Sequence, residues 1–216
     1  MDKLVVLVAG LALAASAGAA PVVAPPSFDA AGLATLQVPR AAAPLGRHAF
    51  APAAGTVIYS TFNSDPDALY DCCVAYALGA AEGDLGFQQQ VAMPFTPATD
   101  AVLKKVYVAI SLDGGTDQMT GVLAEDAGGV PGRTIRQVLI ENLLAPGVCC
   151  DTLSVPGKGT PLAAGRTYWI VAHPTGDTYA GWNYADTGVL GNVAYDGGDG
   201  WRAIVSVQGA FAVVGE

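Results

Sequence analysis

Aromatic and amide side chains lie close together in the last third of the chain. In lectin-type β-sandwiches, exposed rings stack on the C–H faces of sugars while polar neighbours bond the hydroxyl groups. The same rings would otherwise fill a core, because aromatic side chains bury the largest area per residue. The pattern therefore predicts either a carbohydrate-binding face or core packing for Tyr179, Trp182, Asn183, Tyr184 and Trp201.

A glycine-rich acidic loop runs from Asp196 through Asp199 to Gly200, with Asp186 upstream. Carboxylate oxygens are the ligands that Ca²⁺ prefers. The loop lacks the D-x-D-x-D-G spacing of an EF-hand, and Asp and Gly also dominate ordinary β-turns. Two interpretations follow: a structural calcium site built from Asp186, Asp196 and Asp199, or a plain turn.

Catalytic groups are scarce. His173 is the single histidine between Gly55 and Glu216, and the chain has no G-x-S-x-G sequence. A Ser–His–Asp or Cys–His site would have to use His173, and metal sites with several His ligands are excluded by number. Nothing singles out a pair of carboxylates for glycoside hydrolysis. We therefore expect no catalytic residues and interpret His173 as a strand-end residue.

The four cysteines form two doublets, Cys72-Cys73 and Cys149-Cys150. An even number behind an export signal points to disulfides. Neighbouring Cα atoms lie about 3.8 Å apart, which strains a bridge within a doublet. Two bridges between the doublets are the favoured pairing. A zinc site is the alternative, although zinc ligands usually follow C-x2–4-C spacing.

The first 19 residues have the pattern of a secretory signal peptide. Lys3 precedes an apolar run from Leu4 to Ala15, and small residues lead to an Ala17-Gly18-Ala19 exit. As a helix, that run would span roughly 18 Å, too short for a hydrocarbon core of about 30 Å. Residues 20–54 are rich in Ala and Pro without periodicity, so we expect a disordered leader. The protein is predicted to be secreted to the extracellular space or the periplasm.

Residues 55–216 are predicted to form one all-β domain. Short β-type runs alternate with Gly/Pro-rich turns, and no long helical period occurs. This pattern is typical of an antiparallel β-sandwich or jelly roll. The expected strands cover residues 56–62, 70–78, 86–94, 102–112, 119–124, 134–143, 148–155, 166–173, 180–184, 193–195, 201–207 and 210–214.

Several landmarks in this body combine into a family resemblance. They are Tyr70-Asp-Cys-Cys73, the Gln-x-Val-Ala-x-Pro-Phe-Thr-Pro97 run, Gly128-Gly-Val-Pro-Gly132, the stretch 161–171, Gly181-Trp-Asn183, Gly200-Trp201 and Gly209-Ala-Phe211. Over residues 55–216 the chain resembles the bacterial extracellular β-sandwich domains called choice-of-anchor R. That resemblance implies a sandwich fold but no activity, because the family has none established. The chain departs from the family's theme in showing no C-terminal sorting signal, so we expect release from the cell.

The expected function is non-enzymatic binding outside the cell, to a glycan or a matrix component. The net charge of −9 repels phosphate backbones and anionic lipid, which argues against nucleic-acid and membrane partners. No segment of the body reaches the roughly 18 apolar residues of a membrane span. The alternatives are a structural component of a surface layer or matrix, and an uncharacterised hydrolase.

Overall fold

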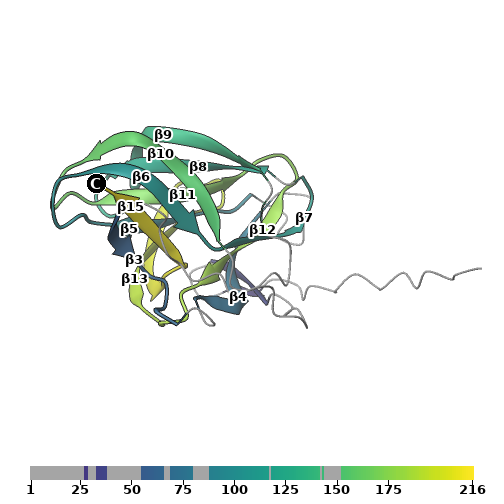
Figure 1. The fold of residues 1–216 in the computed structure, drawn as a ribbon. Helices are drawn as coiled ribbons and strands as arrows, with labels where there is room; N and C mark the ends of the chain where they lie inside the picture. The colour runs from purple at the N-terminus through teal and green to yellow at the C-terminus, as the bar shows by residue number, and fades with distance from the viewer. Residues whose placement is uncertain are drawn as a thin grey trace, which may run out of the picture.

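The computed structural model describes residues 27–28, 33–37, 55–65, 69–79, 88–116, 118–141, 143 and 152–216. Every regular element within these residues is a β-strand, and all strand pairs are antiparallel (Figure 1). The strands form open sheets packed against each other, which confirms the predicted all-β sandwich. Among the described residues, no helix has the length and apolar character needed to cross a membrane.

Three sheets build the sandwich. The largest has six strands in the order β14-β13-β5-β11-β8-β9. Its members are β5 (Gln90–Phe95), β8 (Gln118–Asp126), β9 (Pro131–Glu141), β11 (Tyr168–Pro174), β13 (Leu190–Asp196) and β14 (Arg202–Val207). Strand β11, which corresponds to the run expected at residues 166–173, lies inside this sheet between β5 and β8.

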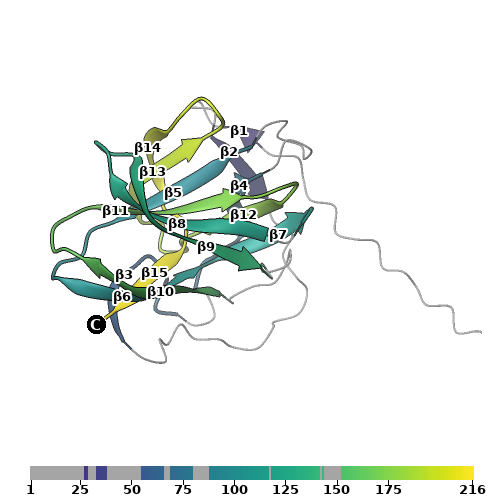
Figure 2. The same ribbon diagram turned by 90° about the horizontal axis from the view of Figure 1, so that it is seen from above.

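Two smaller sheets complete the fold. The four-stranded sheet has the order β10-β6-β15-β3, and the five-stranded sheet has the order β1-β2-β4-β12-β7. The first contains β3 (Thr56–Ser60), β6 (Ala101–Val108), β10 (Leu153–Leu162) and β15 (Phe211–Gly215). The second contains β1 (Ser27–Phe28), β2 (Ala34–Gln37), β4 (Asp71–Leu78), β7 (Ile110–Gly114) and β12 (Tyr179–Tyr184). Figure 2 shows the sheets from a second direction.

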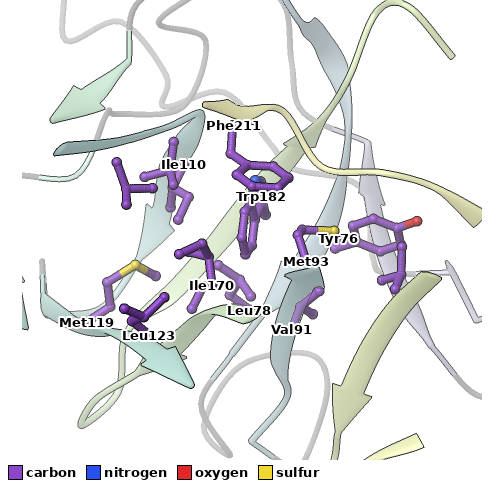
Figure 3. Packing of buried hydrophobic residues seen from close by; sticks show 14 of the residues in the cluster. Tyr76, Leu78, Val91, Met93, Ile110, Met119, Leu123, Ile170, Trp182 and Phe211 are labelled. Carbon is purple, nitrogen blue, oxygen red and sulfur yellow. The ribbon is translucent and has the colours of Figure 1, made fainter. Parts of the chain in front are cut away.

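One hydrophobic core joins all three sheets (Figure 3). It contains Met93 and Ile170 from the six-stranded sheet, Phe211 from the four-stranded sheet, and Leu78 and Trp182 from the five-stranded sheet. Side chains alternate between the two faces of a strand. The six-stranded sheet therefore turns one set of residues into this core and the alternate set outward.

A hydrogen-bonded corner fixes where the two smaller sheets meet. Ala109 lies between β6 and β7, and its N–H donates to the Ala210 carbonyl at 3.1 Å. The Asn183 N–H donates to the Ala109 carbonyl at 2.9 Å, and the Ala210 N–H donates to the Asn183 carbonyl at 2.8 Å. Two side chains add to this ring of bonds: Asn183 Nδ2 donates to the Ala109 carbonyl and Trp182 Nε1 to the Ala210 carbonyl.

The prediction that residues 20–54 form a disordered leader, with the fold starting at Gly55, is wrong for β1 and β2. β2 pairs with β4, with Thr35 opposite Tyr76. Leu33 and Ala34 are both 0% exposed. The Ala- and Pro-rich composition gave no indication of this strand, because the strand packs through small side chains: Ala34 lies against Ala75 and Ala77. An alanine-rich segment buries little area by itself, but here β4 supplies hydrogen bonds and a complementary surface.

The buried amide of Gln89 holds β2 in place. Its Oε1 accepts the Ala34 N–H at 3.0 Å, and its Nε2 donates to the carbonyls of Ala34 at 3.1 Å and Ala77 at 2.6 Å. The side chain is 0% exposed. Ala34 and Ala77 are also 0% exposed. Among the described residues, the Gln89 side chain therefore supplies the partners of these buried backbone groups.

Gln89→Leu is expected to lower the free energy of unfolding by about 1–3 kcal/mol, because it leaves buried backbone groups without partners. Hydrogen exchange at the Ala34 amide should accelerate by at least tenfold. Gln88→Leu is the matched control, since within the described part of the chain the exposed Gln88 amide makes one long contact, to the Gly176 carbonyl at 3.4 Å. Equal exchange at Ala34 in both variants would contradict the role given to Gln89.

Candidate functional site

A groove of about 390 Å³ lies on the outward face of the six-stranded sheet. Strands β5, β8, β9 and β11 contribute to it, together with Thr175, which follows β11, and Trp201, which precedes β14. The lining residues are Gln90, Thr120, Val122, Ala124, Pro131, Gly132, Thr134, Gln137, Val171, His173, Thr175 and Trp201. Pockets of a few hundred cubic ångströms are typical of small-molecule sites.

The two-residue period of the strands builds this groove. In β11, Ile170 and Ala172 face the main core, while Val171 and His173 line the groove. In β8, Leu123 faces the core, while the residues on either side of it face outward. Each strand therefore serves the core and the groove with alternate residues.

The floor of the groove is apolar and well packed. Val171 belongs to a second buried cluster with Ala124 and Trp169, against which Val122 and Trp201 pack. Trp169 is 0% exposed, and its Nε1 donates to Asp126 Oδ1 at 2.8 Å. Trp201 is half-buried: its ring rests on this floor and also borders the groove.

The rim of the groove carries neutral polar groups. Thr120, Thr134 and Thr175 contribute hydroxyl groups, and Gln90 and Gln137 contribute amides. Among the lining residues, His173 is the single titratable side chain, and none is Asp, Glu, Lys or Arg. In a chain with a net charge of −9, this groove therefore offers hydrogen-bonding groups without a permanent charge.

A chain of hydrogen bonds leads from the groove to the acidic loop. His173 Nδ1 lies 2.8 Å from Gln90 Oε1, and Gln90 Nε2 donates to Asp196 Oδ2 at 3.2 Å. The other oxygen, Asp196 Oδ1, accepts the N–H groups of Gly198 at 2.7 Å and Gly200 at 3.0 Å. The carboxylate of Asp196 therefore closes its own turn and supports the His173 end of the groove.

The three carboxylates predicted as calcium ligands do not come together. Asp186 accepts a hydrogen bond from Asn63 Nδ2 at 3.1 Å. Asp199 is exposed and lies 3.9 Å from the Arg202 guanidinium. Within the described residues, no three Asp, Glu, His or Cys side chains gather in a way that would hold a metal ion. The turn interpretation fits Asp196, whose carboxylate is occupied by backbone N–H groups.

Of the five residues predicted as a ligand face, Trp201 alone lines the groove. Trp182 and Asn183 are 0% and 1% exposed and belong to the core and the hydrogen-bonded corner, so neither reaches the surface. The Tyr184 ring packs on Tyr76, with centroids 4.5 Å apart. Tyr179 packs against the alanine cluster of β2 and β4. The prediction of one shared face is therefore wrong, because alternate residues of β12 face opposite sides of their sheet.

Sequence reasoning missed Gln90, Thr120, Thr134, Gln137 and Thr175 as lining residues. A signal existed in the polar or small residues that alternate with core residues, for example Thr120, Val122 and Ala124 around Met119 and Leu123. From the sequence, such positions are indistinguishable from ordinary solvent-facing positions of a strand. Their shared groove depends on which strands become neighbours, and β5, β8 and β11 are far apart along the chain.

Other predictions lie outside the described residues. Cys72 and Cys73 are in β4, but the described structure does not include their side chains, and Cys149 and Cys150 fall outside it. The disulfides therefore stay a prediction, as does the signal peptide at residues 1–19. No family model, curated protein or solved structure matches the chain. The resemblance to choice-of-anchor R domains likewise stays a prediction.

Proposed function

We propose that this protein is a non-catalytic extracellular module that binds carbohydrate in the groove of the six-stranded sheet. The observation that carries the proposal is the composition of the groove. The Trp201 ring and an apolar floor lie within the same groove as hydroxyl, amide and imidazole groups, and no lining residue carries a permanent charge. A sugar matches both kinds of surface: its apolar C–H faces can pack on the ring and the floor, and its hydroxyl groups can donate and accept hydrogen bonds with the polar groups.

The location of the groove also supports binding rather than core packing. Most of its lining residues lie on paired strands, which hold side chains more rigidly than loops do. Trp201 is anchored by its contact with the cluster around Trp169, so its ring would be positioned before a ligand arrives. Preorganised rings lose little conformational entropy on binding.

Binding is tested with the secreted chain on an array of neutral oligosaccharides, followed by calorimetry with the strongest ligand. Trp201→Ala is expected to weaken binding at least tenfold, which corresponds to about 1.4 kcal/mol. Val205→Ala is the matched control: Val205 is 72% exposed on β14 of the same sheet but does not line the groove. It should leave affinity unchanged.

Two results would contradict the proposal. Affinity unchanged in Trp201→Ala would move any sugar site away from the groove. No binding to any glycan, together with self-assembly at modest protein concentration, would favour the structural role in a surface layer or matrix instead.

A further inference from the structure

The hydrogen bonds around Gln90 determine which nitrogen of His173 carries a proton. An ionised carboxylate only accepts hydrogen bonds, so the atom of the Gln90 amide that faces Asp196 must be the donor, Nε2. This leaves Oε1, an acceptor, facing His173 Nδ1 at 2.8 Å. A short contact between two acceptors would be repulsive. Nδ1 must therefore carry the hydrogen.

The opposite orientation of the Gln90 amide is disfavoured by the same groups. It would place Oε1 against the Asp196 carboxylate, so two oxygen acceptors would meet at hydrogen-bond distance. Asp196 cannot turn away freely, because its other oxygen accepts the N–H groups of Gly198 and Gly200. The N–H groups of the glycine-rich turn thus set the orientation of the Asp196 carboxylate, and the carboxylate sets the orientation of the Gln90 amide. The amide in turn determines which nitrogen of His173 carries the hydrogen.

We propose that the Asp196–Gln90 pair holds neutral His173 as its Nδ1–H tautomer, so that the ring offers Nε2 to the groove as a hydrogen-bond acceptor. His173 lines the groove, and Nε2 is its remaining polar atom once Nδ1 is bonded to Gln90. The tautomer is a property of the protein alone. Its use in recognition rests on the proposed carbohydrate-binding function.

Thr175, two residues after His173, also requires a hydrogen-bond donor from the ligand. Thr175 lines the groove, and its hydroxyl donates its hydrogen to the Gln118 carbonyl at 3.1 Å. Toward a ligand the hydroxyl oxygen can therefore act as a hydrogen-bond acceptor. This end of the groove therefore presents two acceptors, with the negative charge of Asp196 behind them. A hydroxyl-bearing neutral sugar supplies the donors that they need. A sulfate or carboxylate supplies acceptors alone and is repelled.

The tautomer is tested by ¹⁵N NMR of the imidazole nitrogens in mildly alkaline buffer, with His173→Gln identifying the signal. We expect the proton on Nδ1 in the wild-type protein. In Asp196→Asn, the Asn Oδ1 can still accept the turn N–H groups, while its Nδ2 faces Gln90. The Gln90 amide should then rotate and donate to His173 Nδ1, which moves the ring proton to Nε2.

Asp199→Asn is the matched control, since it makes the same charge change in the same loop, and the Asp199 carboxylate is 88% exposed. It should leave the proton on Nδ1. A proton on Nε2 in the wild-type protein, or an unchanged tautomer in Asp196→Asn, would overturn the proposal.

Recognition is tested on a pair of polymers with one backbone, hydroxyethyl cellulose and carboxymethyl cellulose, and on neutral and sulfated forms of any array ligand. The neutral form should bind at least tenfold more tightly, and Asp196→Asn should lose that binding while Asp199→Asn keeps it. Preference for the anionic form would overturn the ligand assignment. Absence of all glycan binding would instead overturn the proposed function and leave the tautomer to be judged by NMR.

Discussion

Trp182→Ala is expected to lower the free energy of unfolding by about 3–5 kcal/mol, the range measured for large aromatic residues truncated in a core. Trp182 is 0% exposed and meets the Phe211 ring edge-on, with centroids 6.1 Å apart. A Cβ placed on Gly209 would lie 2.7 Å from Trp182 Nε1, so the indole also packs directly on backbone. Neighbours held by three sheets cannot collapse into the space that the indole leaves.

The truncation also removes a hydrogen bond at the corner where the two smaller sheets meet. Trp182 Nε1 donates to the Ala210 carbonyl at 3.1 Å. The Ala109 N–H still bonds that carbonyl, so the lost packing dominates the loss in stability. Trp182→Phe should recover part of the packing but not this hydrogen bond. Its free energy of unfolding should therefore lie between those of the wild-type protein and Trp182→Ala.

Urea denaturation of Trp182→Ala, Trp182→Phe and Trp201→Ala checks this prediction. Trp201 lies half-buried at a groove, so its truncation should cost well under half of the Trp182→Ala effect. Together the variants separate the residue that holds the fold from the residue proposed to bind ligand. A change of less than about 1 kcal/mol in Trp182→Ala would contradict the core role.

Asp113 is expected to make the protein less stable as pH rises from about 4 to about 7. Both carboxylate oxygens are buried, and within the described structure neither has a hydrogen-bond partner. Ser111 Oγ, on the same strand face, is also buried and has no hydrogen-bond partner among the described residues. Burial disfavours the charged form and raises the pKa of Asp113 from 3.8 to about 7.

The direction of this pH effect on stability follows from which state, folded or unfolded, binds more protons. Between pH 4 and 7, the unfolded chain has ionised Asp113, while the folded protein keeps the proton. The folded state therefore binds more protons, so its stability falls as pH rises, by about 1.4 kcal/mol per pH unit. Over the roughly three pH units between the two pKa values, the contribution of this group amounts to about 4 kcal/mol.

Asp113→Asn removes this titration while keeping size and polarity. The variant should exceed the unfolding free energy of the wild-type protein by about 1 kcal/mol at pH 4.5, where the unfolded carboxyl is already mostly ionised, and by about 4 kcal/mol at pH 8.5. Guanidinium denaturation at the two pH values measures the difference. Asp199→Asn is the control, because its exposed carboxylate should give nearly the same difference from wild type at both pH values. A pH-independent difference for Asp113→Asn would show that the Asp113 carboxyl is solvated.

Strand positions were largely predictable, because alternation and turn residues are local properties. The runs expected at residues 56–62, 70–78 and 210–214 correspond to β3, β4 and β15 within a few residues. One clear miss is β10, which was expected at 148–155 and is described at Leu153–Leu162. The Pro156-Gly-Lys-Gly159 stretch resembles a loop, and Lys158 and Gly159 do have positive φ values of 51° and 73°. Here it is an irregularity in an edge strand paired with β6, where proline and bulges are tolerated.

The sequence by itself determined the fold class and, for most strands, which residues share a face. A two-residue period shows that Val171 and His173 point one way and Ile170 and Ala172 the other, but not which side another sheet covers. Tertiary structure decided that the Trp182 side of β12 is core. It also placed Gln90, His173 and Asp196 in one hydrogen-bonded chain. Local periodicity carries no information about partners 83 and 106 residues away. The long-range pairing of β5 with β11 and β13 brings these three side chains together.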